Sequence, residues 1–201
     1  MSIPIDAPLN GKSEFGQVFW EGVTEVVGQQ EAAELFELTR PAAGLESWQP
    51  TDLPALQAAL QARYGPRGSK GVALRLGRAS FRYGFRRWGE SYGLAAPAFR
   101  LQPLCQRIPA VLRSLADRVA ERYGSSIQVS EDAASWYWRV ESCPVCRQRS
   151  AAEPDCHMLA GLLQGTLAWA GGERYYGVNE VECSATGAPA CLFRIEKKPI
   201  D

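Results

Sequence analysis

Cysteine is concentrated in the last third of this chain. Five of the six cysteines and the single histidine, His157, lie between Cys143 and Cys191 in a sequence of 201 residues. Clustering of this density indicates a metal site, a disulfide or a redox pair, and each of these ties together segments that are distant in sequence. The cluster therefore constrains the fold more than any other feature of the chain.

Composition and charge narrow the class of protein. The chain is 46% hydrophobic, and its 22 basic and 22 acidic residues give a formal net charge of zero, which argues against a general nucleic-acid binder. No apolar run is long enough to span a bilayer, and the first residues lack the basic start and apolar stretch of a signal peptide. We therefore expect a cytoplasmic protein without a membrane span. Thiols stay reduced there, so clustered cysteines hold metal more often than they form disulfides.

The first two thirds of the chain have helical periodicity. Gly77 and Gly84 lie inside one expected helix, where each costs roughly 1 kcal/mol relative to alanine. Glycines retained in such positions indicate that another helix or a ligand approaches the backbone closely. The apolar spacing predicts helices over 14–28, 53–65, 70–93 and 104–124, and 31–38 forms either a helix or part of a loop.

Beyond Gly124 the pattern changes to strict alternation. It predicts strands over 127–129 and 136–140, a helix that is capped by Asp155 and runs to Gly171, and strands over 175–183 and 191–195. The expected fold class is α+β, with N-terminal helices packed on an antiparallel sheet of two hairpins with an intervening helix. Residues 1–50 are expected to be an N-terminal extension with a helix packed on the domain, and 51–201 a small-molecule-binding domain with its motifs in 124–196.

The positions of three cysteines suggest how they meet. Cys183 and Cys191 are symmetric about Gly187, so a hairpin centred there makes them neighbours across the strands. Cys156 begins a helix, where free backbone N–H groups favour a thiolate. Three thiolates need a fourth ligand to close a tetrahedral zinc site. The candidates for that ligand are Glu180, His157, Cys143 and Cys146.

The same residues resemble a known family. The pattern C-H-x-x-x-G-x-L-x-G followed by E-x-x-C-x-x-x-G-x-x-x-C-x-F, from Cys156 to Phe193, is similar to the 4-vinyl reductase domain family. The resemblance implies a helix-and-antiparallel-sheet fold related to Golgi transport-particle subunits, a dimer, and an apolar cavity. It also implies a structural zinc ion held by a Cys, a Glu and two further Cys. Those four ligands correspond to Cys156, Glu180, Cys183 and Cys191.

Two features complicate this ligand set. Glu180 and Cys183 fall on opposite faces of a straight strand, so both reach one metal only if the strand bends, bulges or ends between them. The Cys143-x-x-Cys146 pair lies outside the pattern. With Cys156 and His157 it could form a rival metal site or a knuckle that orders the loop, whereas a redox pair would lack its usual βαβ setting. The remaining cysteine, Cys105, is expected on a buried apolar helix face.

Aromatic residues are the candidates for a ligand cavity. They are either ordinary core or the wall of an apolar pocket. A basic stripe on the same helix (Arg75, Arg78, Arg82 and Arg86) is either a solvated face or a clamp for a ligand carboxylate. The candidate ligand-binding residues are Phe81, Tyr83, Phe85, Trp88, Trp136 and Trp138.

Catalytic signatures are missing from the sequence. It has no nucleotide-binding glycine motif and no nucleophile elbow, and its one histidine lies among the cysteines, so no independent general base is available. We therefore predict a non-enzymatic protein that binds a small hydrophobic or aromatic ligand in an apolar cavity of a zinc-stabilised homodimer. The alternative is an enzyme, accessory or carrier protein in the vinyl reduction of a (bacterio)chlorophyll tetrapyrrole, and this alternative follows from the resemblance alone.

Overall fold

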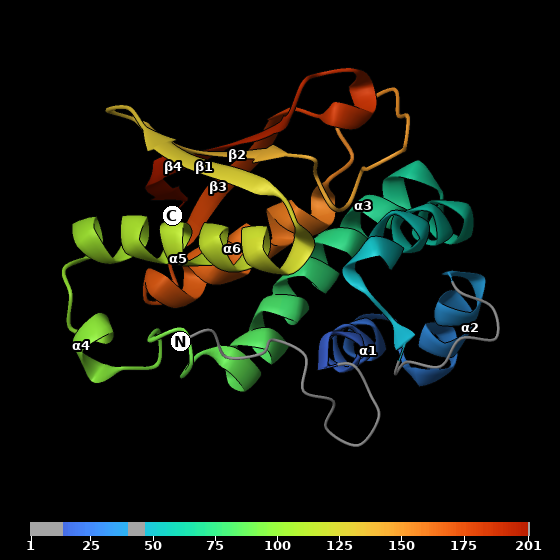
Figure 1. Cartoon of the computed structure of the whole chain (residues 1–201), viewed down its shortest axis with the longest axis horizontal. Helices are drawn as coiled ribbons and strands as arrows, with labels where there is room; N and C mark the ends of the chain where they lie inside the picture. Colours follow the sequence, from blue (N-terminus) through green and yellow to red (C-terminus); the bar gives the residue numbers. More distant parts are fainter. Residues whose placement is uncertain (1–13, 40–46, 201) are drawn as a thin grey trace.

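The structure is a computed structural model that describes residues 14–39 and 47–200. The first part of the chain is helical, as the periodicity predicts, and the ambiguous segment 31–38 lies within a helix (Figure 1). The helices are α1 (Glu14–Val27), α2 (Gln29–Thr39), α3 (Leu53–Trp88), the one-turn α4 (Pro97–Arg100) and α5 (Leu104–Tyr123).

Helix α3 joins the two helices expected over 53–65 and 70–93. The backbone breaks at Gly65, which has φ 68°, and Pro66 then starts the second half. This second half ends at Trp88, so the predicted end at Gly93 is wrong. The chain turns there instead: the N–H of Leu94 bonds to the carbonyl of Gly89, and Gly93 adopts a positive φ of 69° that favours glycine.

The rest of the chain forms a four-stranded antiparallel sheet with one helix between its strand pairs. The strands are β1 (Ser126–Glu131), β2 (Ser135–Glu141), β3 (Tyr175–Glu182) and β4 (Cys191–Ile200), and the helix is α6 (His157–Ala170). The order β1-β2-β4-β3 places the β2–β4 pair at the centre of the sheet, with Val140 opposite Cys191. The fold class is therefore α+β, as expected.

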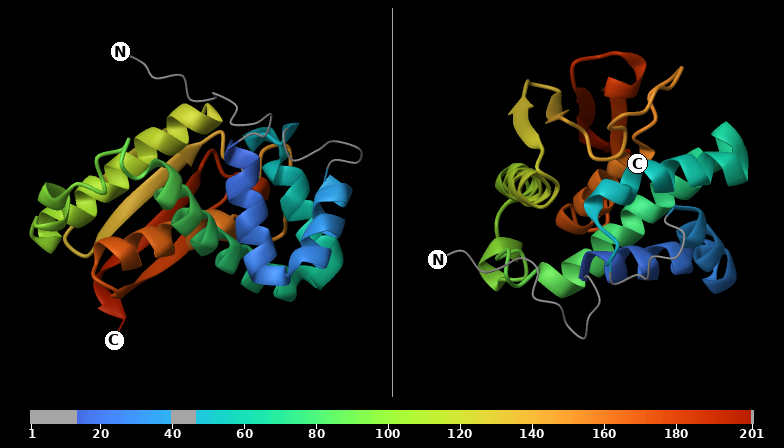
Figure 2. Two further views of the ribbon diagram at one scale, coloured as in Figure 1. Left: turned by 90° about the horizontal axis from the view of Figure 1, so that it is seen from below. Right: turned by 45° about the vertical axis from the view of Figure 1, so that its right-hand side comes forward.

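The helices are layered on this sheet. Helix α5 packs against β1 and α6 packs against β3, whereas α3 packs mainly against α6 and α1 packs against α3 (Figures 1 and 2). The prediction that the N-terminal helices pack on the sheet is thus wrong for α1 and α3, which lie beyond α6. The reason is that α6 is apolar around most of its circumference, so both of its sides need to be covered.

The crossing of α3 and α6 depends on glycine. A Cβ atom on Gly77 would lie 2.0 Å from the carbonyl oxygen of Met158, and one on Gly161 would lie 2.1 Å from that of Leu74. The expectation that another helix approaches Gly77 is confirmed. A Cβ atom on Gly84 would instead meet the ring of Trp88 at 3.1 Å.

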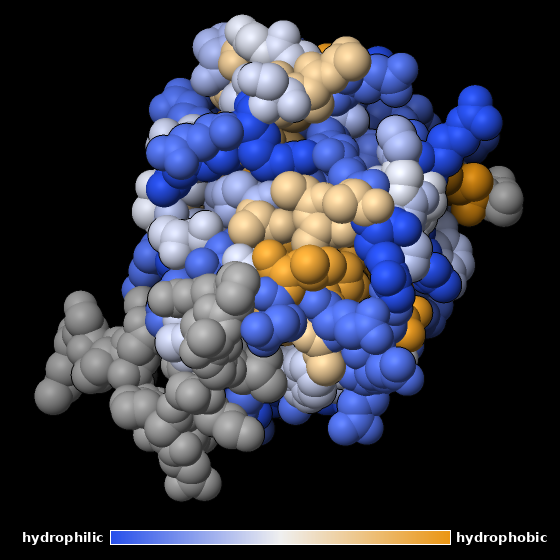
Figure 3. Space-filling view, turned by 90° about the vertical axis from the view of Figure 1, so that its right-hand side faces the viewer, coloured by the Kyte–Doolittle hydropathy of each residue, from blue (hydrophilic) through white to orange (hydrophobic). Residues whose placement is uncertain are grey.

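The surface carries few large apolar side chains. The face in Figure 3 is mostly hydrophilic, with hydrophobic residues gathered over a limited central area. Over 14–39 and 47–200, no helix is long and apolar enough to cross a membrane. The large hydrophobic residues that are exposed in this part of the chain are Leu38, Leu101, Tyr175, Val181 and Ile200.

Candidate metal centre and apolar cavity

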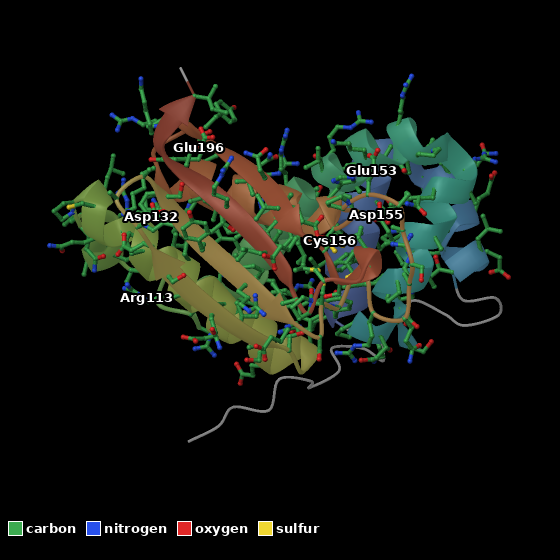
Figure 4. The ribbon with its side chains drawn as sticks, turned by 90° about the horizontal axis from the view of Figure 1, so that it is seen from above. Arg113, Asp132, Glu153, Asp155, Cys156 and Glu196 are labelled. Carbon is green, nitrogen blue, oxygen red and sulfur yellow. The ribbon has the colours of Figure 1, made fainter. Side chains whose placement is uncertain are left out.

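Five cysteines converge at one end of the sheet. Cys143 and Cys146 lie in the loop after β2, Cys156 immediately precedes α6, Cys183 follows β3, and Cys191 begins β4. All five side chains are buried. Figure 4 shows Cys156 and Asp155 where the sheet meets the α3 side of the molecule, with sulfur atoms beside Cys156.

The sulfur atoms are spaced as ligands of a single ion would be. The Sγ of Cys156 lies 3.5 Å from that of Cys143, 3.8 Å from that of Cys183 and 3.7 Å from that of Cys191. The Sγ of Cys146 lies 3.4 Å from that of Cys191. These distances far exceed a disulfide bond of about 2.05 Å. A tetrahedron of thiolates at the usual Zn–S distance has edges of about 3.8 Å, so the donor set and its spacing fit zinc.

Two groups of four residues bring their ligand atoms within 4.8 Å of one another. One is Cys156, Glu180, Cys183 and Cys191, the set that the family resemblance implies, and the other is Cys143, Cys146, Cys156 and Cys191. His157 belongs to neither group. It is the first residue of α6, and burial lowers the pKa of its imidazole.

An irregularity in β3 lets Glu180 face the cysteines. The register of β3 on β4 shifts between Glu180 and Glu182, and the strand ends directly before Cys183. This is the bend that the alternation of a straight strand requires. One carboxylate oxygen of Glu180, Oε2, accepts a hydrogen bond of 2.8 Å from the N–H of Cys156. The other, Oε1, is buried and has no hydrogen-bond partner among the described residues.

The cysteines and Glu180 perturb one another's protonation. Burial raises the pKa of Glu180 to about 9, although the N–H of Cys156 opposes this shift. Hydrogen bonds from neighbouring thiols, that of Cys143 first, lower the pKa of Cys191 to about 4, and contacts led by Cys146 lower the pKa of Cys183 to about 6. The pKa of Cys146 rises to about 12, chiefly through Cys143. Negative charge is therefore favoured on Cys183 and Cys191, where the other thiols donate to it.

Asp155 does not cap α6, contrary to the sequence prediction. The N-cap is Cys156, without a side-chain cap bond, because the carboxylate of Asp155 points to α3 and the cysteine loop. It accepts hydrogen bonds from Gln57 and Gln61, both at 2.9 Å, and pairs with Arg149 at 2.6 Å. This buried network joins α3 to the chain beside Cys156.

Cys105 also departs from expectation, because its side chain is exposed. It lies in the first turn of α5, whose apolar face is formed by later residues such as Ile108 and Leu112. Cys105 is therefore separate from the buried cluster.

An apolar cavity of about 100 Å³ lies between the helices. Three of the predicted ligand-binding residues, Phe81, Phe85 and Trp88, line it. The other three lie elsewhere. Tyr83 stacks under Arg86, Trp138 is fully buried against the backbone of α5, and Trp136 packs on Tyr176 and Lys197.

Residues from α1 and α5 complete the cavity, and no sequence pattern separates them from ordinary core. Phe15, Val18 and Phe19 of α1 form part of the wall. Few polar atoms belong to it: the Oγ of Ser80 and the Nε of Arg118 come from lining residues and have no hydrogen-bond partner within the described chain. These two atoms are donors available to a ligand in otherwise apolar surroundings.

The basic stripe of α3 lies outside this cavity. Arg75, Arg78, Arg82 and Arg86 line a separate surface groove together with Trp169. Arg82 pairs with Glu25, and Arg78 donates to the side chain of Gln164 at 2.8 and 3.0 Å. The stripe therefore does not form the mouth of the apolar cavity.

Solved structures share the fold over nearly the whole chain. An H-NOX protein from Shewanella oneidensis, in the Fe(II)NO ligation state, has a TM-score of 0.63 and 16% identity, covering 94% of this chain and 99% of that one. A mutant of the T. tengcongensis H-NOX protein has a TM-score of 0.59 and 15% identity, covering 93% and 98%. At these identities the likeness concerns the fold alone.

Sequence comparison finds relatives of the C-terminal part. An uncharacterized protein of Methanocaldococcus jannaschii is 36% identical over 58 residues, which are 29% of this chain and 32% of that protein. The chain thus spans about a third of the length of the curated relative it matches. The 4-vinyl reductase domain model matches residues 136–197, a segment that holds all five clustered cysteines and Glu180. By this match, residues 136–197 belong to the 4-vinyl reductase domain family.

Proposed function

We propose that this protein binds a small apolar or aromatic molecule in the cavity between α1, α3, α5 and α6, beside a structural zinc site. The observation that carries the proposal is the cavity itself, an internal space whose wall is almost wholly apolar. Ligand sites of this kind combine apolar walls with a few polar groups that orient the ligand. Here those groups are Ser80 and Arg118, whose buried atoms suit a ligand with a hydrogen-bond acceptor.

Size favours a small ligand over a tetrapyrrole. The cavity of about 100 Å³ is on the scale of the engineered protein cavity of about 150 Å³ that binds benzene, and it is smaller than drug-sized sites of about 300 Å³ or more. A tetrapyrrole would require the helices to separate. Vinyl reduction of such a pigment is therefore supported only by the domain family.

The H-NOX likeness does not extend to an Fe(II) centre in the cavity. His157 is the only histidine in the chain and is not among the residues that line the cavity. An iron ion there would lack an imidazole ligand, the usual protein nitrogen ligand of Fe(II). The NO-ligated state of the S. oneidensis protein is thus not carried over to this chain.

Thermal unfolding with toluene, phenol and protoporphyrin IX tests the cavity. We expect toluene and phenol to raise the unfolding temperature, with phenol also responding to loss of the Ser80 hydroxyl in Ser80→Ala. Ser114→Phe puts a ring into the cavity wall and should abolish both shifts, whereas Ser130→Phe, on the exposed face of β1, should retain them. Equal shifts in both phenylalanine variants, or a response to the porphyrin alone, would reject a small-ligand cavity.

The zinc site is proposed at Cys156, Glu180, Cys183 and Cys191, since these four ligand atoms approach one another within 4.8 Å. Four protein ligands leave no open position for water, so zinc here would support the fold without catalysing a reaction. Native mass spectrometry of the reduced protein should detect bound zinc. A folded protein that binds none at micromolar zinc would remove this part of the proposal.

Assembly and location are further parts of the proposal. The domain family suggests a homodimer, and the lack of a signal-peptide pattern in the sequence suggests the cytoplasm. Sedimentation equilibrium over a range of protein concentrations measures the first, and fractionation of the source cells measures the second. A monomer at all concentrations, or recovery outside the cytoplasm, would contradict them.

A further inference from the structure

The cysteine cluster offers more ligands than one tetrahedral ion can use. Its two groups of four, Cys143, Cys146, Cys156 and Cys191 and then Cys156, Glu180, Cys183 and Cys191, share Cys156 and Cys191 alone. Two tetrahedra with a common edge describe a binuclear centre, in which two thiolates bridge both ions. We propose that this corner binds two zinc ions bridged by Cys156 and Cys191. The inference rests on the zinc site of the proposed function and adds a second ion to it.

The sulfur positions fit this arrangement on both sides of the shared edge. The edge itself, from Cys156 to Cys191, measures 3.7 Å. On one side, the Sγ of Cys143 lies 3.5 Å from that of Cys156, and the Sγ of Cys146 lies 3.4 Å from that of Cys191. On the other side, the Sγ of Cys183 lies 3.8 and 4.0 Å from the same two sulfurs. A zinc–thiolate tetrahedron has edges of about 3.8 Å.

Burial disfavours a single ion in either group. One ion held with Glu180 and Cys183 leaves Cys143 and Cys146 without a cation, at 1% and 2% exposure. One ion held by the four cysteines leaves the Oε1 of Glu180 buried, with no hydrogen-bond partner in the part of the chain that the structure describes. Buried polar groups of this kind are normally paired or coordinated. Two ions give every one of these groups a ligand role.

Charge leads to the same result. Five thiolates and one carboxylate carry six negative charges, of which two divalent cations offset four and one cation only two. Backbone donors offset part of the remainder. The N–H of Cys156 donates to Glu180 at 2.8 Å, and that of Ser184 donates to the Sγ of Cys191 at 3.3 Å.

The loop after β2 supplies the two ligands that the family pattern lacks. The N–H of Arg147 bonds to the carbonyl of Cys143 at 3.1 Å, and that of Arg149 bonds to the carbonyl of Cys146 at 3.0 Å. These turns fold the loop compactly around both cysteines. The central pairing of Val140 with Cys191 then sets the loop beside the start of β4.

An iron–sulfur cluster fits this geometry less well. Its bridging sulfides lie between the iron ions and hold the cysteines of different irons apart. Here thiols from the two groups approach Cys156 and Cys191 directly, at 3.4 to 4.0 Å. The space between them suits metal ions bound by thiolate alone.

Zinc counting on the reduced full-length chain tests the stoichiometry. The protein is saturated with zinc, desalted and measured by native mass spectrometry, and we expect two ions per chain. Cys143→Ser with Cys146→Ser should retain one ion, as should Glu180→Gln with Cys183→Ser. The control Cys105→Ser, at the exposed cysteine, should retain two. One ion in the unaltered chain overturns the binuclear centre but leaves the zinc site of the proposed function intact, whereas none overturns both.

Cobalt tests the bridge without any substitution, so it does not depend on a variant that folds. The metal-free chain is titrated with Co(II) and followed by electron paramagnetic resonance. The high-spin signal should grow with the first equivalent and fall with the second, because bridging thiolates couple the two ions antiferromagnetically. A signal that doubles with the second equivalent would show two independent ions and overturn the bridge.

Discussion

Among single residues, the pair formed by Asp155 and Arg149 is the charged contact that supports the metal corner. Their side chains are 8% and 12% exposed, and Asp155 also accepts hydrogen bonds from two glutamines of α3. Removing one partner of a buried ion pair leaves the other charge uncompensated, which typically costs about 3–5 kcal/mol. This contact therefore matters more than the exposed ion pairs of the surface.

We expect Asp155→Ala to lower the free energy of unfolding by about 3 kcal/mol. Urea denaturation of the zinc-saturated protein measures the change. Glu131→Ala, which breaks the exposed pair with Lys197, serves as the control and should change stability little. An equal effect of the two substitutions would show that the buried network does not hold α3 to the metal corner.

Among the helices and strands, the crossing of α3 and α6 sets the distance between two helical layers. Gly77 and Gly161 let the backbones approach until only hydrogen atoms fit between them. An added methyl group must push the helices apart, and overpacking of this kind commonly costs about 1–3 kcal/mol. The crossing also shapes the cavity, because Gly77 and Met158 both line it.

Gly161→Ala should therefore destabilise the protein by about 3 kcal/mol and weaken the binding of toluene. The matched control is Gly71→Ala in α3, where a Cβ atom would meet nothing within 4 Å. That change should stabilise the protein by up to about 1 kcal/mol through helix propensity. Thermal unfolding of both variants, with and without toluene, distinguishes the crossing from a general effect of alanine.

Across the molecule as a whole, the metal corner ties four separate parts of the chain together. The loop after β2, the start of α6, the end of β3 and the start of β4 all contribute ligands. The unfolded chain does not hold these ligands close together, so the free energy of zinc binding adds to the free energy of folding. Metal loss should consequently loosen the β3–β4 end of the sheet first.

Removal of zinc with a chelator under reducing conditions should lower stability by about 4 kcal/mol when free zinc had exceeded its dissociation constant a thousandfold. Hydrogen exchange should increase most around Cys183 and Cys191 and least in α1, which contributes no ligand to either group of four. Readdition of zinc is the control for irreversible damage. Unchanged exchange around Cys183 after complete metal removal would contradict a structural role for the ion.

Much of the architecture could be predicted from the sequence because it follows from local patterns. The 3.6-residue spacing of Phe15, Val18 and Phe19 specifies α1, and alternation around Trp136 and Trp138 specifies β2. Element boundaries follow less directly, as the early end of α3 at Trp88 illustrates. There the turn bonds to the carbonyl of Gly89 compete with continued helix, and periodicity does not register this competition.

The candidate site divides in the same way. Residue identities alone established which side chains could bind metal and, through the motif from Cys156 to Phe193, which domain family the C-terminal part belongs to. Packing of the whole chain was needed to bring Cys146 against Cys191, since this contact depends on the central pairing of β2 with β4. Likewise, the bulge that turns Glu180 toward the thiols arises from β3 against β4. Contacts between distant segments depend on the packing of every element between them, and no local pattern encodes them.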